Sequence, residues 1–105
     1  NGYYLEPTII EGLAYNCRTN QEEIFGPVVT ITPFETEEEV MIYANSTQYG
    51  LASTVWTQDV TKANRVAMNL HTGIVWINVG YCVTYERHLV VLNHQVLVVK
   101  VVLRL

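Results

Sequence analysis

The sequence predicts an α/β fold with a parallel sheet, in the order strand, helix, strand, helix, strand. Three observations indicate this: short β-branched runs recur, capped stretches with helical periodicity lie between them, and the turns that join them are short. Strands that alternate with single helices are typical of βαβ units, whose strands run parallel. A parallel sheet needs cover on both faces and this chain offers two helices, so we expect an incomplete portion of a larger α/β domain.

The N-terminal third is predicted to be extended or irregular. Residues Tyr3–Ile10 are β-prone, and Pro7 favours an edge or an irregular end. The polar stretch Gly12–Gln21 is expected to be a loop. The β-branched run Val28–Phe34 predicts the next strand, which Pro33 closes.

A helix is predicted over Glu37–Asn45. Thr36 and Glu39 have the spacing of a capping box, in which each side chain accepts a hydrogen bond from the backbone near the other residue. Acidic residues in a first helical turn also interact favourably with the helix dipole. We therefore interpret the acidic run as the solvated start of a helix rather than a pair of catalytic carboxylates.

The second half repeats the alternation of strand and helix. Leu51–Thr57 predicts a strand, and either Asp59 or Thr61 can cap the helix that follows. Gly73 is expected to end that helix and to open a third strand over Gly73–Asn78. The apolar stripe of this second helix consists of Ala63, Val66, Ala67 and Leu70.

The character of the chain changes after Asn78, and we divide it into residues 1–78 and a divergent hydrophobic tail, 79–105. The segment Leu89–Leu105 approaches the length of a membrane span but carries too many polar residues for one. Within it, Val96–Leu103 is β-prone and aggregation-prone. A change of reading frame, or retained non-coding sequence, would produce such a break.

Composition excludes several classes of partner. The net charge of -4 and the scattering of six basic residues argue against nucleic acid. Cys17 and Cys82 lie far apart and no secretory leader is evident, so we expect free thiols and a cytoplasmic location, without membrane insertion. The triplet that begins at Asn45 fits a glycosylation site, but we discount it for the same reason.

Familiar catalytic and metal-binding patterns are missing from the sequence. Its glycines form no dinucleotide or phosphate loop, and His71, His88 and His94 show no metal-ligand spacing. Arg18 could lower the pKa of the Cys17 thiol, yet no neighbouring base supports a nucleophile there. We therefore predict no catalytic residue and no metal in this chain.

The stretch QEEIFGPVV is the strongest candidate for a site. Glu23 lies two residues before Phe25, and the Gly26-Pro27 corner that follows restricts the backbone. A carboxylate can accept two hydrogen bonds from the vicinal diol of a ribose, and a phenyl ring can lean against a flat heterocycle. The alternative is that Glu23 is a loop acid and Phe25 an ordinary core residue.

Several segments, in a fixed order, carry a resemblance to a known family. They are GYYLEPTII, EEIFGPVVTITPF, EEV, AN, YGLASTVWT, A-x-RVA and TGIVWIN. Over Gly2–Asn78 the chain resembles the C-terminal part of the catalytic domain of the NAD(P)-dependent aldehyde dehydrogenase superfamily. It looks most like the muconic semialdehyde dehydrogenase branch.

The resemblance implies roles for individual residues. Glu23 matches the family glutamate that holds the nicotinamide-side ribose hydroxyls, and Phe25 the aromatic residue beside the nicotinamide ring. Glu22 matches no catalytic role, and Asn78 matches a supporting position at a strand end near the substrate pocket. The implied reaction oxidises an aldehyde to a carboxylic acid with NAD or NADP.

The chain also departs from the family pattern. The nucleophilic cysteine, the general base and most of the dinucleotide-binding domain precede this region in the family, and Cys17 does not stand in the nucleophile's motif. We therefore expect the 105 residues alone to be inactive. Intact members are expected to form homo-oligomers, but that expectation is doubtful for this chain. The alternatives are a free-standing α/β interaction or regulatory module and an inactive truncated product.

Overall fold

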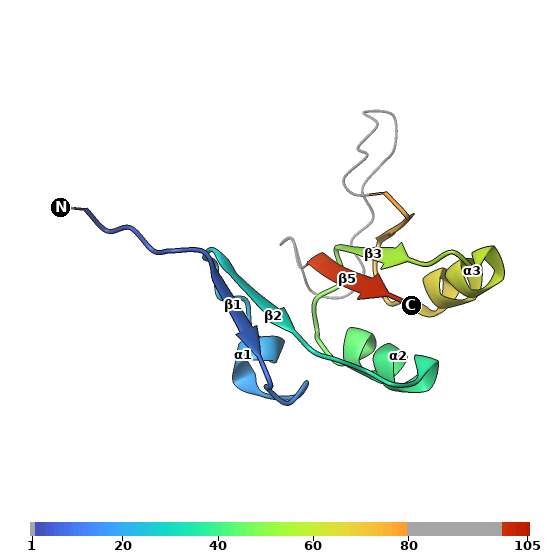
Figure 1. Ribbon diagram of the computed structural model, residues 1–105, viewed down its shortest axis with the longest axis horizontal. Helices are drawn as coiled ribbons and strands as arrows, with labels where there is room; N and C mark the ends of the chain where they lie inside the picture. The colour runs from blue at the N-terminus through green and yellow to red at the C-terminus, as the bar shows by residue number, and fades with distance from the viewer. Residues whose placement is uncertain (1, 80–99) are drawn as a thin grey trace.

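Two short parallel sheets, rather than one, carry the strands of this protein. The computed structural model describes residues 2–79 and 100–105, apart from the side chains of 100–104. The first sheet pairs β1 (Thr8–Glu11) with β2 (Val28–Ile31), and the second has β3 (Ala52–Trp56) between β4 (Ile74–Ile77) and β5 (Lys100–Arg104). Every pair is parallel, which confirms the predicted fold class. The two sheets lie apart, as Figure 1 shows.

Three helices connect these strands: α1 (Arg18–Gln21), α2 (Glu37–Asn45) and α3 (Val60–Asn69). The bounds of α2 agree with the prediction, and the Thr36 hydroxyl accepts a hydrogen bond from the Glu39 N–H at 3.1 Å. The Glu39 carboxylate accepts from the Glu35 N–H at 2.8 Å, so the reciprocal bond of the capping box forms one residue early. Asp59 caps α3 by accepting from the Lys62 N–H at 3.0 Å.

Several expected boundaries were wrong. The segment Gly12–Gln21 is not all loop, because α1 occupies its last four residues. β1 begins only at Thr8, and β2 ends at Ile31, before the expected Pro33. Gly73 does not end α3; it donates its N–H to the Gly50 carbonyl at 2.8 Å and so belongs to the start of the β3–β4 ladder.

The core lies on one face of β3. The fully buried Val55 of β3 packs in one cluster with Val40 of α2, with Val66 of α3 and with Leu70, which directly follows α3. Both helices therefore cover the same face of this strand. This arrangement agrees with the expectation that two helices cover one face of the sheet.

Polar contacts hold the two long helices together. Arg65 of α3 donates two hydrogen bonds of 2.7 Å to the Glu37 carboxylate of α2. The Asn45 amide donates to the Asn69 carbonyl and accepts from the His71 N–H, both at 2.9 Å. The amide nitrogen that a glycan would need is therefore already engaged.

The tail enters the described structure only at residue 100. From there the expected β-prone stretch forms β5, which runs parallel to β3 in register from Ala52 opposite Lys100. The rest of that stretch, and Cys82, His88 and His94, lie outside the described residues. No described helix is long and apolar enough to cross a membrane. The division of the chain at Asn78 stays a prediction.

Candidate functional site

A tight corner joins α1 to β2 and presents Phe25 to solvent. Phe25 has a φ of 54° and its side chain is 81% exposed. The left-handed backbone region is unfavourable for bulky residues, and such outliers cluster at functional sites. After it, the Val28 N–H donates to the Gly26 carbonyl at 2.8 Å and the Thr8 N–H donates to the Pro27 carbonyl at 2.8 Å. The corner is thus locked to the first rung of the β1–β2 ladder.

The two adjacent acids of the corner have different surroundings. Glu22 accepts a hydrogen bond of 2.8 Å from the Arg18 guanidinium, and this bond raises the pKa of Arg18. Within residues 2–79 and 100–105, the half-buried Glu23 carboxylate accepts no hydrogen bond. The Glu23 backbone N–H donates to the Tyr49 hydroxyl at 3.4 Å. Of the two acids, Glu23 is therefore the one available to a ligand.

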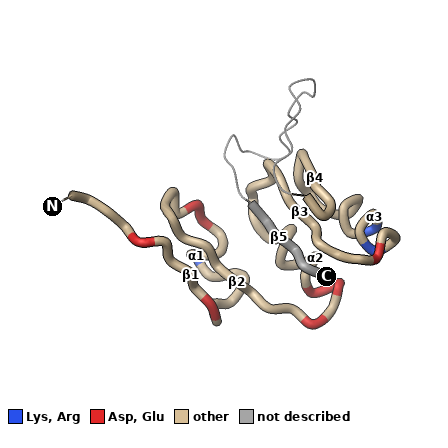
Figure 2. The backbone as a smooth tube through the Cα atoms, turned by 45° about the horizontal axis from the view of Figure 1, so that its top comes forward, with Lys and Arg blue, Asp and Glu red and all other residues tan. Residues whose placement is uncertain are grey.

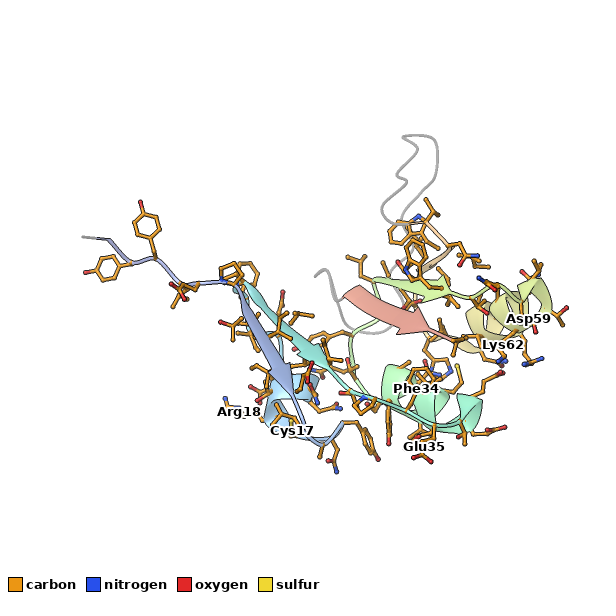
Figure 3. The ribbon with its side chains drawn as sticks, in the orientation of Figure 1. Cys17, Arg18, Phe34, Glu35, Asp59 and Lys62 are labelled. Atoms are coloured by element: carbon orange, nitrogen blue, oxygen red, sulfur yellow. The ribbon has the colours of Figure 1, made fainter. Side chains whose placement is uncertain are left out.

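Cys17 does not form a catalytic arrangement. It is half-buried at the N-cap of α1, where its side chain makes no capping bond. Figure 3 shows Cys17 and Arg18 together at the start of α1. The Arg18 guanidinium binds Glu22 rather than acting as a partner of the thiol. His71 is exposed, and no group of three metal-ligating side chains occurs in the part of the chain that the structure describes.

A second polar arrangement lies at the carboxyl ends of β3 and β4. Asn78, at a φ of 54°, donates its backbone N–H to the Val55 carbonyl at 2.8 Å. Its side-chain amide accepts from the Thr57 N–H at 2.9 Å and donates to the Thr57 carbonyl at 2.8 Å. The Asn78 side chain thereby adds one rung to the parallel ladder. This geometry accounts for Asn78 as structural support.

An open hollow lies above these strand ends. In α/β sheets, the carboxyl edge is the usual place for a ligand. Asp59 and Lys62 mark this end of α3 in Figure 3, and their contact through the helix cap keeps the carboxylate of Asp59 occupied. The residues that line the hollow are Trp56, Thr57, Gln58, Asp59, Asn78 and Leu105.

Charge is spread thinly over the described residues. Of the residues whose side chains the structure describes, the basic ones lie apart, on α1 and α3, whereas the acidic ones are spread over the part of the chain up to Asp59 (Figure 2). The acids that the fold engages are Glu22, Glu37, Glu39 and Asp59. Hydrogen bonds to Arg65, to the Glu35 N–H and to the Lys62 N–H lower the pKa values of Glu37, Glu39 and Asp59 respectively. These three carboxylates therefore stabilise the first turns of α2 and α3.

The corner offers the two kinds of group that the sequence predicts for a nicotinamide nucleotide. The Glu23 carboxylate has free acceptor capacity for a pair of hydroxyl groups. The uncovered Phe25 ring offers a flat apolar surface two residues away. The sequence indicated both residues. It did not indicate Tyr49, Thr57 or Ser46, whose hydroxyl accepts a hydrogen bond of 3.0 Å from the Gln21 side-chain amide, because no local pattern connects them to the corner or to Asn78.

Parallel strands joined through helices define an α/β protein, and polar groups lie at the strand ends, where proteins of this class usually bind ligands. A sequence model of the aldehyde dehydrogenase family matches residues 1–90 of the chain. This chain belongs to the aldehyde dehydrogenase family.

Individual relatives agree with this membership. The chain is 47% identical over 81 residues to a 2-aminomuconic 6-semialdehyde dehydrogenase of a Pseudomonas species, a match that covers 77% of this chain and 16% of the relative. The resemblance to the muconic semialdehyde dehydrogenases is thus confirmed. The chain spans about a sixth of the length of the curated relatives it matches.

Solved structures agree as well. The crystal structure of PnpE from Pseudomonas sp. WBC-3 matches with a TM-score of 0.83 and 40% identity, over 89% of this chain and 19% of that one. The NAD⁺ complex of an aldehyde dehydrogenase from Bacillus cereus matches with a TM-score of 0.71 and 45% identity, over 73% of this chain and 16% of that one.

Proposed function

We propose that this chain supplies the nicotinamide-side cofactor contact of an NAD(P)-dependent aldehyde dehydrogenase. In this role the Glu23 carboxylate accepts hydrogen bonds from the ribose hydroxyls, and the Phe25 ring packs beside the nicotinamide. The substrate class is an aldehyde, and the product is a carboxylic acid. The whole enzyme would work in the cytoplasm, a location that the unpaired thiol of Cys17 supports.

One observation carries the proposal: of two adjacent acids, the one nearer to the exposed Phe25 has a carboxylate that accepts no hydrogen bond from any described residue. Glu22 is bound to Arg18, whereas Glu23 is left free. A free carboxylate next to an uncovered ring matches the donor groups and the flat surface of a nucleoside. Solved structures of similar proteins support the choice of cofactor, since one is an NAD⁺ complex.

The contribution of these residues is one of orientation. When bound, NAD(P) supplies the hydride acceptor for aldehyde oxidation. Glu23 would fix the ribose in one rotation, and Phe25 would limit the tilt of the neighbouring ring. Because rate depends on the alignment of reacting atoms, removing either group should reduce turnover more than stability.

The test uses a complete enzyme: the Bacillus cereus aldehyde dehydrogenase with residues 2–78 of this chain in place of its matching segment. We expect Glu23→Gln to lower kcat/KM for NAD⁺ about ten- to a hundredfold, since a hydrogen bond to a charged group is lost. Glu22→Gln is the matched control, because it changes the neighbouring acid that Arg18 already binds. Equal kinetics of the two variants would contradict the proposal.

We further propose that the 105-residue chain alone does not oxidise aldehydes. Orientation of a cofactor lowers no barrier without a nucleophile and a base, and the described residues bring no such pair to Cys17. Purified chain incubated with an aldehyde and NAD⁺ should form no NADH. Sustained NADH formation, proportional to the amount of chain, would show that this part of the proposal is wrong.

A further inference from the structure

The corner that carries Glu23 and Phe25 cannot be held by its own packing. Neither strand of the adjoining sheet contains a buried residue, and Ile24, Phe25, Gly26 and Pro27 are all exposed. The preceding helix, α1, has four residues and buries none of them. An orientation precise enough for a cofactor therefore needs support from elsewhere in the chain.

That support comes from the connection between α2 and β3. The Tyr49 hydroxyl accepts the hydrogen bond of 3.4 Å from the Glu23 backbone N–H, across 26 residues of sequence. The Ser46 hydroxyl accepts a hydrogen bond of 3.0 Å from the Gln21 side-chain amide, across 25 residues. These two contacts lie on either side of Glu22, so they define both the position and the rotation of the segment that enters the corner.

The connection is itself firmly held. The Ser46 hydroxyl donates to the Tyr43 carbonyl at 2.8 Å, and the Tyr49 N–H donates to the Thr47 hydroxyl at 2.8 Å. The ring of Tyr43 stacks on that of Tyr15 with centroids 4.6 Å apart. Directly after Tyr49 the chain enters the buried run 50–55 of the core strand. The connection thus links the corner, through hydrogen bonds, to the buried strand of the core.

We propose that Tyr49 and Ser46 are positioning residues that orient the Glu23 carboxylate for the cofactor. This inference rests on the proposed function of Glu23. Neither side chain needs to touch the nucleotide, because Tyr49 acts on the Glu23 backbone and Ser46 on Gln21. The long Tyr49 contact is of the kind that shortens when a ligand draws the carboxylate forward.

The first experiment measures the orientation directly in the 105-residue chain. Tyr49→Phe removes only the hydroxyl and should speed the hydrogen exchange of the Glu23 amide, which then lacks its acceptor. Tyr4→Phe is the matched control, since the Tyr4 side chain is 93% exposed. Unchanged exchange at Glu23 in Tyr49→Phe would overturn the proposal.

The second experiment measures the consequence in the complete chimeric enzyme described above. Tyr49→Phe and Ser46→Ala should each raise the dissociation constant and the KM for NAD⁺ about two- to tenfold, with the KM for the aldehyde unchanged. Added to Glu23→Gln, either change should have no further effect, because both act through Glu23. A structural role would instead lower the melting temperature and add to Glu23→Gln.

The outcomes separate the two proposals. If Glu23→Gln weakens NAD⁺ binding and Tyr49→Phe and Ser46→Ala do not, the positioning role is wrong and the proposed function stands. If Glu23→Gln leaves NAD⁺ binding unchanged, the proposed function is wrong. A weaker binding of NAD⁺ by Tyr49→Phe would then show that Tyr49 does not act through Glu23, so the positioning role is wrong as well. Additive losses in the double variants likewise overturn the positioning role.

Discussion

The two strand pairs β1–β2 and β3–β4 have the same connectivity but opposite burial. Each joins two parallel four- or five-residue strands through a helix. In the first pair no residue is buried, whereas four of the five residues of β3 are. The first pair carries the proposed cofactor corner, and the second contributes to the hydrophobic core.

Helix length explains the difference. At a rise of about 1.5 Å per residue, α1 is about 6 Å long and cannot present an apolar stripe to a strand. The ten residues of α3 place Ala63 and Val66 on one side, and both are buried. Strand–helix–strand order in a sequence therefore predicts parallel pairing, but burial of the strands requires a helix long enough to cover them. The proposed cofactor corner lies on the uncovered pair, and the segment that leads into it is hydrogen-bonded to the connection between α2 and β3.

The strongest test of this difference in burial is the same substitution, valine to alanine, in both strand pairs. Val55 is 0% exposed in β3, whereas Val29 is 53% exposed in β2. Val55→Ala should lower the free energy of unfolding by about 2–3 kcal/mol, because it removes buried methyl groups and leaves a cavity. Val29→Ala should change it by less than about 0.5 kcal/mol. Urea unfolding of both variants measures this, and equal losses would show that β1–β2 is as well packed as β3.

A smaller loss is expected where Asn78 closes the β3–β4 ladder. Asn78→Ala removes both side-chain bonds to Thr57 and leaves a residue with a Cβ in the left-handed region, so we expect a loss of about 1–2 kcal/mol. Asn78→Gly also removes the bonds but tolerates the positive φ. It should be more stable than the alanine variant by about 1 kcal/mol. Indistinguishable alanine and glycine variants would mean that the backbone here is unstrained.

The start of α2 offers a still smaller effect. Thr36→Ala removes the hydroxyl that accepts the Glu39 N–H and should lower the free energy of unfolding by about 1 kcal/mol. Thr36→Ser keeps the hydroxyl and should retain most of the stability. A serine variant as unstable as the alanine variant would assign the effect to the lost methyl group rather than to the cap.

The smallest effect concerns pH and salt at the contact of α2 with α3. The hydrogen bond from Arg65 lowers the pKa of Glu37, so the folded state binds fewer protons than the unfolded state near that pKa. The stabilisation is thus present above the ordinary glutamate pKa of about 4.3 and is lost as the pH falls through the lowered value. Glu37→Gln should flatten this acid limb of an unfolding curve, and Glu38→Gln, an exposed neighbour, should not.

High salt should shrink the same difference, because the Glu37–Arg65 pair is partly exposed. If Glu37→Gln leaves the loss of stability at low pH unchanged, that loss must come from another carboxylate. Glu39 and Asp59 are the candidates, because backbone hydrogen bonds also lower their pKa values. Unfolding curves of Glu39→Gln and Asp59→Asn, measured at the same pH values, would show which carboxylate causes the loss of stability.

Much of the local architecture could be predicted because its signals span only a few residues. The cap at Thr36 and the periodicity up to Asn45 defined α2 to the residue. The sequence allows either Asp59 or Thr61 to cap α3, and in the structure Asp59 is the cap. The end of α3 was misplaced, because the chain leaves the helix at an extended Leu70 without using the nearby Gly73.

The candidate site was predictable in its residues but not in its surroundings. Glu23 and Phe25 follow from the EEIFGP segment, and their cofactor contact stays a prediction. No local pattern indicated that Arg18 would engage Glu22 and leave Glu23 free, nor that Phe25 would adopt a left-handed backbone. The resemblance to the family implies a role for the corner, whereas the structure shows its contacts with Tyr49 and Ser46.

Local spacing alone was sufficient for the start of α2, for the two candidate caps of α3 and for the alternation of strands and helices after Val28. Those features depend on contacts within about one helical turn, which the order of neighbouring residues encodes directly. The Asn78 rung and the contacts of Tyr49 and Ser46, in contrast, join residues more than twenty positions apart. Such partners meet only when the core around Val55 has brought their segments together, because closing a loop of that length costs entropy that burial must offset.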